Sequence, residues 1–229
     1  MRTLLDGLRW LLAPESWKDL GGIPQRSFEH LSISLLVIAV ACAIALPVGL
    51  YIGHTRRGEF LAVSIANVGR ALPSFGILAL VFPFTLRYLP GIAFWPTFIA
   101  LLLLSIPPLL TNTYVGIQTV DPDIVEAARG TGMTGRQVLL GLELPLAAPL
   151  LVAGLRTAAV QVVATATLGA VVGGGGLGRF ILDGFAARDN ARLLGGAILV
   201  ALLAIMTDLA LGALERAASP RVASTAKRV

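Results

Sequence analysis

The feature that most constrains this chain is a run from Leu31 to Gly53 that holds no Asp, Glu, Lys or Arg. A stretch of about 20 apolar residues is long enough for a helix to cross the hydrocarbon core of a membrane. Only 14% of the residues are charged and 56% are hydrophobic, whereas a soluble domain has about 25% charged residues. The sequence therefore predicts an all-α integral membrane protein.

Four further apolar runs follow, at 60–84, 95–120, 145–172 and 193–214. Arg70 and Pro73 interrupt the run at 60–84, which is either one bent helix or two short ones. Five spans are therefore predicted, and an odd number places the two termini on opposite sides of the membrane. The basic residues are shared equally between the two sides, so the positive-inside rule leaves the orientation open.

The segments outside these runs have their own patterns. Residues 2–12 gather five leucines on one helical face, which predicts an amphipathic helix at the membrane interface. Pro14, Gly21, Gly22 and Pro24 then interrupt this helical pattern. We therefore divide the chain into an N-terminal interfacial segment (1–29), a transmembrane domain (30–215) with a Gly-rich loop at 173–192, and a basic tail (216–229).

The sequence contains no recognisable motif for ATP binding, catalysis or metal binding. Lys18 and Lys227 are the only lysines, and neither forms the Gly-Lys-Ser/Thr loop that holds ATP phosphates. If ATP drives this protein, another chain binds it. No catalytic triad, paired acid–base carboxylates or metal motif is found, and His30 and His54 are not spaced as a ligand pair. We expect a non-enzymatic chain without a metal.

Two compositional signals have simpler explanations. The basic residues lie mostly between apolar runs, so the pI of about 10.1 indicates charges that flank membrane spans and not a nucleic-acid site. Gly173, Gly175 and Gly178 spell G-x-G-x-x-G, but no soluble strand precedes them, as a dinucleotide fold requires. A tight turn or close helix packing explains these glycines better.

The polar segment 121–145 reads DPDIVEAARGTGMTGRQVLLGLELP. Asp121 or Asp123 can cap a helix, with Pro122 suited to its first turn. Gly130 and Gly132 should end that helix, and Thr134 and Gln137 have the spacing of a capping box. These signals predict two short helices joined by a glycine hinge outside the membrane. Such an elbow suits docking into a groove on a partner, and the alternative is a longer polar loop.

The same segment resembles the cytoplasmic EAA motif of binding-protein-dependent ABC importer permeases. The matching residues are Glu126, Ala127, Ala128, Gly132, Leu142, Leu144 and Pro145, with isoleucine more usual at the position of Leu142. The resemblance implies the type I (MetI-like) permease fold, in which this elbow is a coupling helix seated on an ATPase subunit. Glu126, Ala127, Ala128, Gly132, Leu142 and Pro145 would then be the ATPase-coupling residues.

The resemblance also implies the partners and the orientation. Two ATPase subunits would bind ATP and magnesium, so this chain would need no cofactor. A second permease subunit, identical or homologous, would complete the path, and an extracytoplasmic binding protein would deliver solute. The elbow would be cytoplasmic, with the N-terminus outside and the C-terminus inside a bacterial cytoplasmic membrane.

Further stretches are similar to osmoprotectant permeases, which import glycine betaine, choline, carnitine and related compounds. These stretches lie at 70–80, 96–117, 153–178 and 202–209. An importer of amino acids or of a compound such as ergothioneine is the first alternative. An ATP-independent secondary carrier is a second, although the short chain shows no inverted repeat, and a membrane scaffold is a third.

Polar residues inside the spans are candidates for the translocation path or gate. A buried charge in a membrane needs a partner or water, so Arg156 and Asp208 are expected to pair between helices or to line a path. Arg156 near a helix end could instead extend to the interface, as could Arg70. The remaining path and gate candidates are Asn67, Arg70, Ser74, Asn112, Thr113, Tyr114, Gln161 and Thr165. Hydrogen bonding between helices is the alternative role for these side chains.

Overall fold

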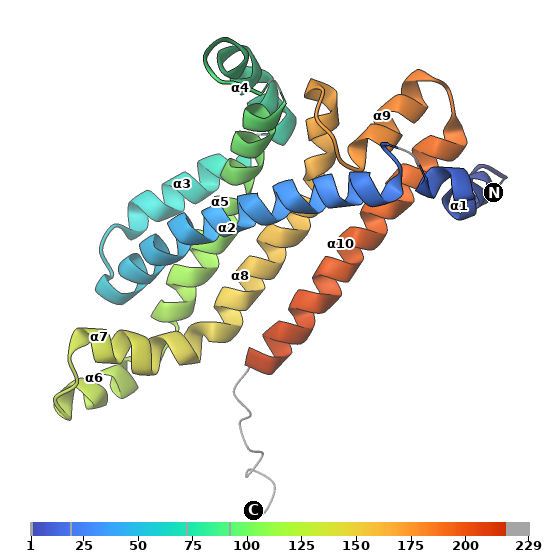
Figure 1. Cartoon of the computed structure of the whole chain (residues 1–229). Helices are drawn as coiled ribbons and strands as arrows, with labels where there is room; N and C mark the ends of the chain where they lie inside the picture. The colour runs from blue at the N-terminus through green and yellow to red at the C-terminus, as the bar shows by residue number, and fades with distance from the viewer. Residues whose placement is uncertain (1, 19, 72, 92, 219–229) are drawn as a thin grey trace, which may run out of the picture.

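The computed structural model describes residues 2–18, 20–71, 73–91 and 93–218, and this part of the chain is helical without a strand (Figure 1). The elements before the elbow are α1 (Arg2–Leu12), the 3-10 turn η1 (Pro14–Trp17), α2 (Ile23–Thr55), α3 (Glu59–Ala71), α4 (Ser74–Tyr88) and α5 (Phe94–Gln118). The elements from the elbow onward are α6 (Pro122–Gly130), α7 (Gly135–Val138), the π-helical η2 (Leu139–Glu143), α8 (Leu144–Thr165), the 3-10 helix η3 (Ala166–Val172), α9 (Gly178–Ala186) and α10 (Asn190–Ala218).

The predicted spans are present. Among the described residues, α2, α5, α8 with its flanking turns, and α10 are long and apolar enough to cross a membrane. The run at 60–84 is two helices, α3 and α4, whose segments Ala62–Gly69 and Ser74–Tyr88 meet at 91°. Pro73 lies at this bend, where its ring fixes φ and it offers no N–H to a continuing helix. The span count is therefore four, or five if the bent pair is one crossing.

Helix α5 is the centre of the fold and packs against α2, α3, α4 and α8, while α10 packs against α8 and α9. Small residues allow the close approach. A Cβ atom on Gly49 of α2 would lie 2.7 Å from Cβ of Thr113 on α5, and one on Gly154 of α8 would lie 2.6 Å from Cβ of Asn112. Glycines thus set the distance between α5 and both neighbours.

The helices end in two groups on opposite sides of the molecule. The elbow α6–α7, the end of α2 and the end of α10 lie on one side, and α1, α9 and the start of α10 lie on the other (Figure 1). The amphipathic helix α1 packs across α10 there. The described chain therefore begins on the side of α1 and ends, at Ala218, on the side of the elbow (Figure 1).

The structure differs from the prediction in the Gly-rich segment and in where the first span begins. The segment 173–192 is not only a loop, since α9 occupies Gly178–Ala186 and α10 begins at Asn190. The predicted break after residues 2–12 is present, since α1 ends at Leu12. The next helix then begins early: Gly22 is the N-cap of α2 and Pro24 lies in its first turn, where a missing N–H costs nothing. The expected boundary between residues 29 and 30 thus falls inside α2, and the expected tail lies outside the described residues beyond Ala218.

Candidate functional site

The elbow is built by local capping chemistry. The Asp121 carboxylate accepts a hydrogen bond from the Asp123 backbone N–H at 2.9 Å and caps α6. After α6, Gly132 has φ +89, a conformation that side chains other than glycine rarely adopt. Thr134 and Gln137 then form a complete capping box at α7. The predicted pair of short helices joined at glycine is confirmed.

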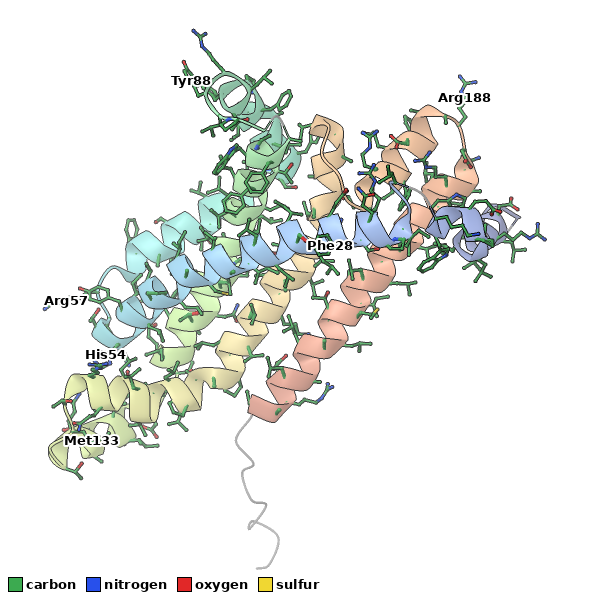
Figure 2. All side chains as sticks on the ribbon, viewed as in Figure 1. Phe28, His54, Arg57, Tyr88, Met133 and Arg188 are labelled. Atoms are coloured by element: carbon green, nitrogen blue, oxygen red, sulfur yellow. The ribbon has the colours of Figure 1, made fainter. Side chains whose placement is uncertain are left out.

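The elbow residues are presented to the outside of this chain. No residue of α6 is buried, and Glu126, Ala127 and Gly132 are exposed while Ala128 is half-buried. Farther on, Leu142 is half-buried and Pro145 is exposed in the first turn of α8. Met133 marks the tip of the elbow, far from the spans (Figure 2). A surface that is not used within the chain is available to a partner.

One polar contact, which sequence reasoning missed, ties the elbow to α2. His54 Nδ1 donates to Glu143 Oε2 at 2.6 Å, and the Glu143 side chain is only 6% exposed. The two residues are 89 positions apart, so no spacing rule points to them. A cavity of about 750 Å³ lies beside this contact and is also lined by Arg57, Glu126 and Arg129.

The intramembrane charges form an ion-pair group between α8 and α10. Arg156 donates from Nε and Nη2 to the two carboxylate oxygens of Asp208, at 2.7 and 2.8 Å, and from Nη1 to Glu215 at 3.0 Å. A fork of this kind suits the planar guanidinium. The structure thus realises the expected pairing between helices and adds Glu215. The side chain of Arg70 lies outside the described residues.

The other path candidates whose side chains are described differ in their burial within this chain. Thr113 and Tyr114 are buried in helix packing, and the Thr113 hydroxyl donates to the Leu109 carbonyl of its own helix at 2.7 Å. Asn112 is half-buried and donates to the Pro108 carbonyl at 2.8 Å. Ser74 and Thr165 are half-buried, whereas Asn67 and Gln161 are exposed on α3 and α8.

A second polar cluster lies at the opposite end of α2. Glu29 Oε2 accepts from the Gly176 N–H at 2.8 Å and from Arg26 Nη1 at 2.9 Å. The buried His30 donates from Nε2 to the Val163 carbonyl at 2.8 Å, which leaves its Nδ1 without a partner. These residues line a cavity of about 490 Å³ between α2, α5 and the Gly-rich loop. Among the described residues, no group of three His, Cys, Asp or Glu side chains is placed to hold a metal.

Comparison with known proteins places these features in a family. The model of the family described as "Binding-protein-dependent transport system inner membrane component" matches residues 45–221. The choline transport system permease protein OpuBB of Bacillus subtilis is 36% identical over 200 residues, which are 87% of this chain and 90% of the relative. The carnitine transport permease protein OpuCB of Listeria monocytogenes is 35% identical over 202 residues, 88% and 90% of the two chains. The osmoprotectant import permease protein OsmW of Salmonella typhimurium is 33% identical over 203 residues, 89% and 94%.

Solved structures share the fold. An inward-facing structure of the MetNI methionine ABC transporter matches with a TM-score of 0.76 and 22% identity, over 93% of this chain and 98% of that chain. An amino acid ABC transporter with histidines matches with a TM-score of 0.63 and 21% identity, over 84% and 90% of the two chains. The predicted MetI-like permease fold is confirmed, and at this identity the likeness concerns the fold alone.

Proposed function

Because this chain belongs to the family of inner membrane components of binding-protein-dependent transport systems, we propose that it carries an osmoprotectant-type quaternary amine into the cell. Glycine betaine, choline and carnitine are the compounds of this class. The observation that carries the substrate class is the set of relatives at 33–36% identity, which are permeases for choline, carnitine or osmoprotectants. The chain itself is a non-catalytic transport subunit.

We further propose the assembly in which it works. Two ATPase subunits bind ATP and magnesium, a second permease subunit completes the path, and an extracytoplasmic binding protein delivers the solute. The lack of a phosphate-binding loop around Lys18 or Lys227 supports an ATPase on another chain. The elbow lies on the cytoplasmic face of the bacterial inner membrane, with the N-terminus outside and the C-terminus inside.

The mechanism we propose is alternating access. Closure of the ATPases on ATP pushes the coupling residues from Glu126 to Gly132, and the movement opens the outer mouth to the binding protein. Hydrolysis returns the inward-facing state. The exposure of the elbow supports this role, since none of the residues in α6 is buried within the chain.

The translocation path is expected where two permease subunits meet. Exposed polar side chains within apolar spans, such as Asn67 and Gln161, suit a wet path better than a lipid face. Arg70, Ser74 and Thr165 remain candidates for the same path. The segment Asn112–Tyr114, in which Thr113 and Tyr114 are buried, is proposed to act as a gate through its packing and not through contact with solute.

The substrate is tested by ligand screening of the binding protein encoded beside this subunit. Titration calorimetry with glycine betaine, choline, carnitine and proline betaine should show binding of at least one compound. Binding of an amino acid or of ergothioneine instead, with none of the four recognised, would replace the osmoprotectant assignment by the alternative importer.

The coupling role is tested by Glu126→Lys in the complete transporter. Reversal of an exposed charge on the docking surface should lower ATP-driven uptake at least tenfold while membrane insertion is unchanged. Glu59→Lys is the matched control, because Glu59 is an exposed carboxylate at the same end of the molecule but outside the elbow. Normal uptake by Glu126→Lys would contradict the coupling assignment.

A further inference from the structure

We propose that the hydrogen bond between His54 and Glu143 is the contact through which movement of the coupling elbow reaches α2 and, through α2, the gate segment of α5. The inference rests on the proposed coupling role of the elbow and assigns positioning roles to two residues that are not among the matching residues of the EAA motif. It concerns the junction of α2, α7 and η2 (Figure 2).

The contact is short and shielded. The Nδ1–Oε2 distance is 2.6 Å, and the side chains are 19% and 6% exposed. An ionised carboxylate only accepts hydrogen bonds, so Nδ1 carries the proton. Because water has little access to this pair, its loss leaves a buried carboxylate oxygen without a partner. The contact therefore resists separation when the elbow is displaced.

The imidazole of His54 lies beside two parts of the elbow segment. Glu143 ends η2, where the elbow joins α8, and Gly135 begins α7. A Cβ atom on Gly135 would lie 3.3 Å from His54 Nε2, so the elbow backbone lies directly against the ring. The backbones of α2 and of the elbow otherwise make little contact. His54 thus links the end of α2 to the elbow segment through its side chain.

The junction is suited to a small change of direction. The five residues Leu139–Glu143 form a π-helical turn between α7 and α8. Such turns are rare and are often found at functional sites. A tilt of the elbow changes the direction of the chain at this turn, and Glu143 at its end then moves relative to α2.

From His54 the movement has a packed route into α5. Gly53 and Gly49 lie one and five positions before His54 on α2. A Cβ atom on Gly53 would lie 2.6 Å from Cβ of Ile117, and one on Gly49 would lie 2.7 Å from Cβ of Thr113. Tightly packed helices shift as units and do not deform locally. A displacement of the end of α2 must therefore be accommodated at Thr113 and Tyr114.

The test measures solute transported per ATP hydrolysed, with the complete transporter and its binding protein in proteoliposomes. Glu143→Leu, which keeps the size but removes the acceptor, should lower this ratio at least threefold. Glu143→Gln retains an acceptor for Nδ1 and should restore the ratio to within twofold of wild type. Glu59→Leu is the control, since it removes an exposed hydrogen bond between α3 and α5 at the same end.

A double-mutant cycle separates a link from two independent structural effects. If His54 and Glu143 act through one bond, His54→Ala combined with Glu143→Leu should lower the ratio no further than either single change. If the effects multiply, or if Glu143→Leu leaves the ratio unchanged, the proposal is overturned. Should Glu143→Leu fail to assemble, Gly135→Val displaces the ring from the exposed side and should give the same loss.

Failure of the His54–Glu143 inference can be distinguished from failure of the proposed transport function. The wild-type transporter is assayed first with whichever solute its binding protein retains. If the wild type shows no ATP-driven uptake of any solute, the proposed function fails. If the wild type is active and Glu143→Leu matches it in solute per ATP, only the His54–Glu143 inference fails.

Discussion

Glycines gather at both ends of this molecule, in the elbow at 130–141 and in the Gly-rich segment at 173–178. Around Gly130 and Gly132 of the elbow, a Cβ atom would meet nothing within 4 Å. At Gly178 it would lie 2.8 Å from the Thr167 Cα atom and closer still to the carbonyl oxygen of that residue. Gly130 and Gly132 thus have open space around them, and Gly132 needs glycine only for its backbone conformation, whereas Gly178 needs glycine for room.

The two ends of the molecule have different tasks. In the elbow, space around the backbone leaves α6 free for a partner. At the opposite end, the loop is packed against η3, is held by Glu29 and lines the cavity between α2 and α5. Replacement of glycine by alanine should therefore affect coupling in the elbow and assembly of the fold in the Gly-rich segment.

The largest effect is expected for Gly178→Ala. The new methyl group would clash with backbone atoms of Thr167, which cannot move aside as the end of a flexible side chain can. Overpacking of this kind costs about 3 kcal/mol, which for a chain of this size lowers the unfolding midpoint by roughly 6–12 °C. Thermal unfolding of the purified transporter in detergent measures it. An unchanged midpoint would show that α9 and η3 are not packed as described.

Gly132→Ala should have a smaller effect on stability and a larger one on function. Alanine at φ +89 costs about 1–2 kcal/mol in local conformation, but the position is open and nothing clashes. We therefore expect normal membrane insertion, a midpoint lowered by a few degrees, and uptake reduced more than stability would explain. Uptake in proteoliposomes at matched protein amounts checks this. Loss of the protein from the membrane would instead show that Gly132, like Gly178, is needed for packing of the fold.

Much of the fold follows from the sequence because its signals are local or periodic. The uncharged run at 31–53 predicts a span without reference to any other part of the chain, and Thr134 and Gln137 form the box that their spacing predicts. The helix α9 was missed because glycines on both sides of a short amphipathic segment give the composition of a loop. Its helical conformation depends on packing against α10.

The candidate site is predictable only in part, because some of its contacts join residues that are distant in the sequence. The coupling residues form a contiguous motif that can be recognised, whereas the contact between His54 and Glu143 joins residues 89 positions apart. Arg156 and Asp208 could be expected to pair because a charge in a span needs a partner. The hydrogen bond from Arg156 to Glu215 could not be expected, since it depends on how α8 and α10 pack together.

The smallest effect on stability is expected for Gly130→Ala. Gly130 ends α6, has a helical backbone and faces open space, so a methyl group neither strains nor clashes. Because glycine in a helix is less favourable than alanine by about 0.5–1 kcal/mol, the midpoint should stay the same or rise slightly. Thermal unfolding beside Gly132→Ala and Gly178→Ala provides the comparison. A fall at Gly130 as large as the fall at Gly178 would mean that this face of α6 is covered within the transporter, and the elbow would then be a packed element and not a free docking surface.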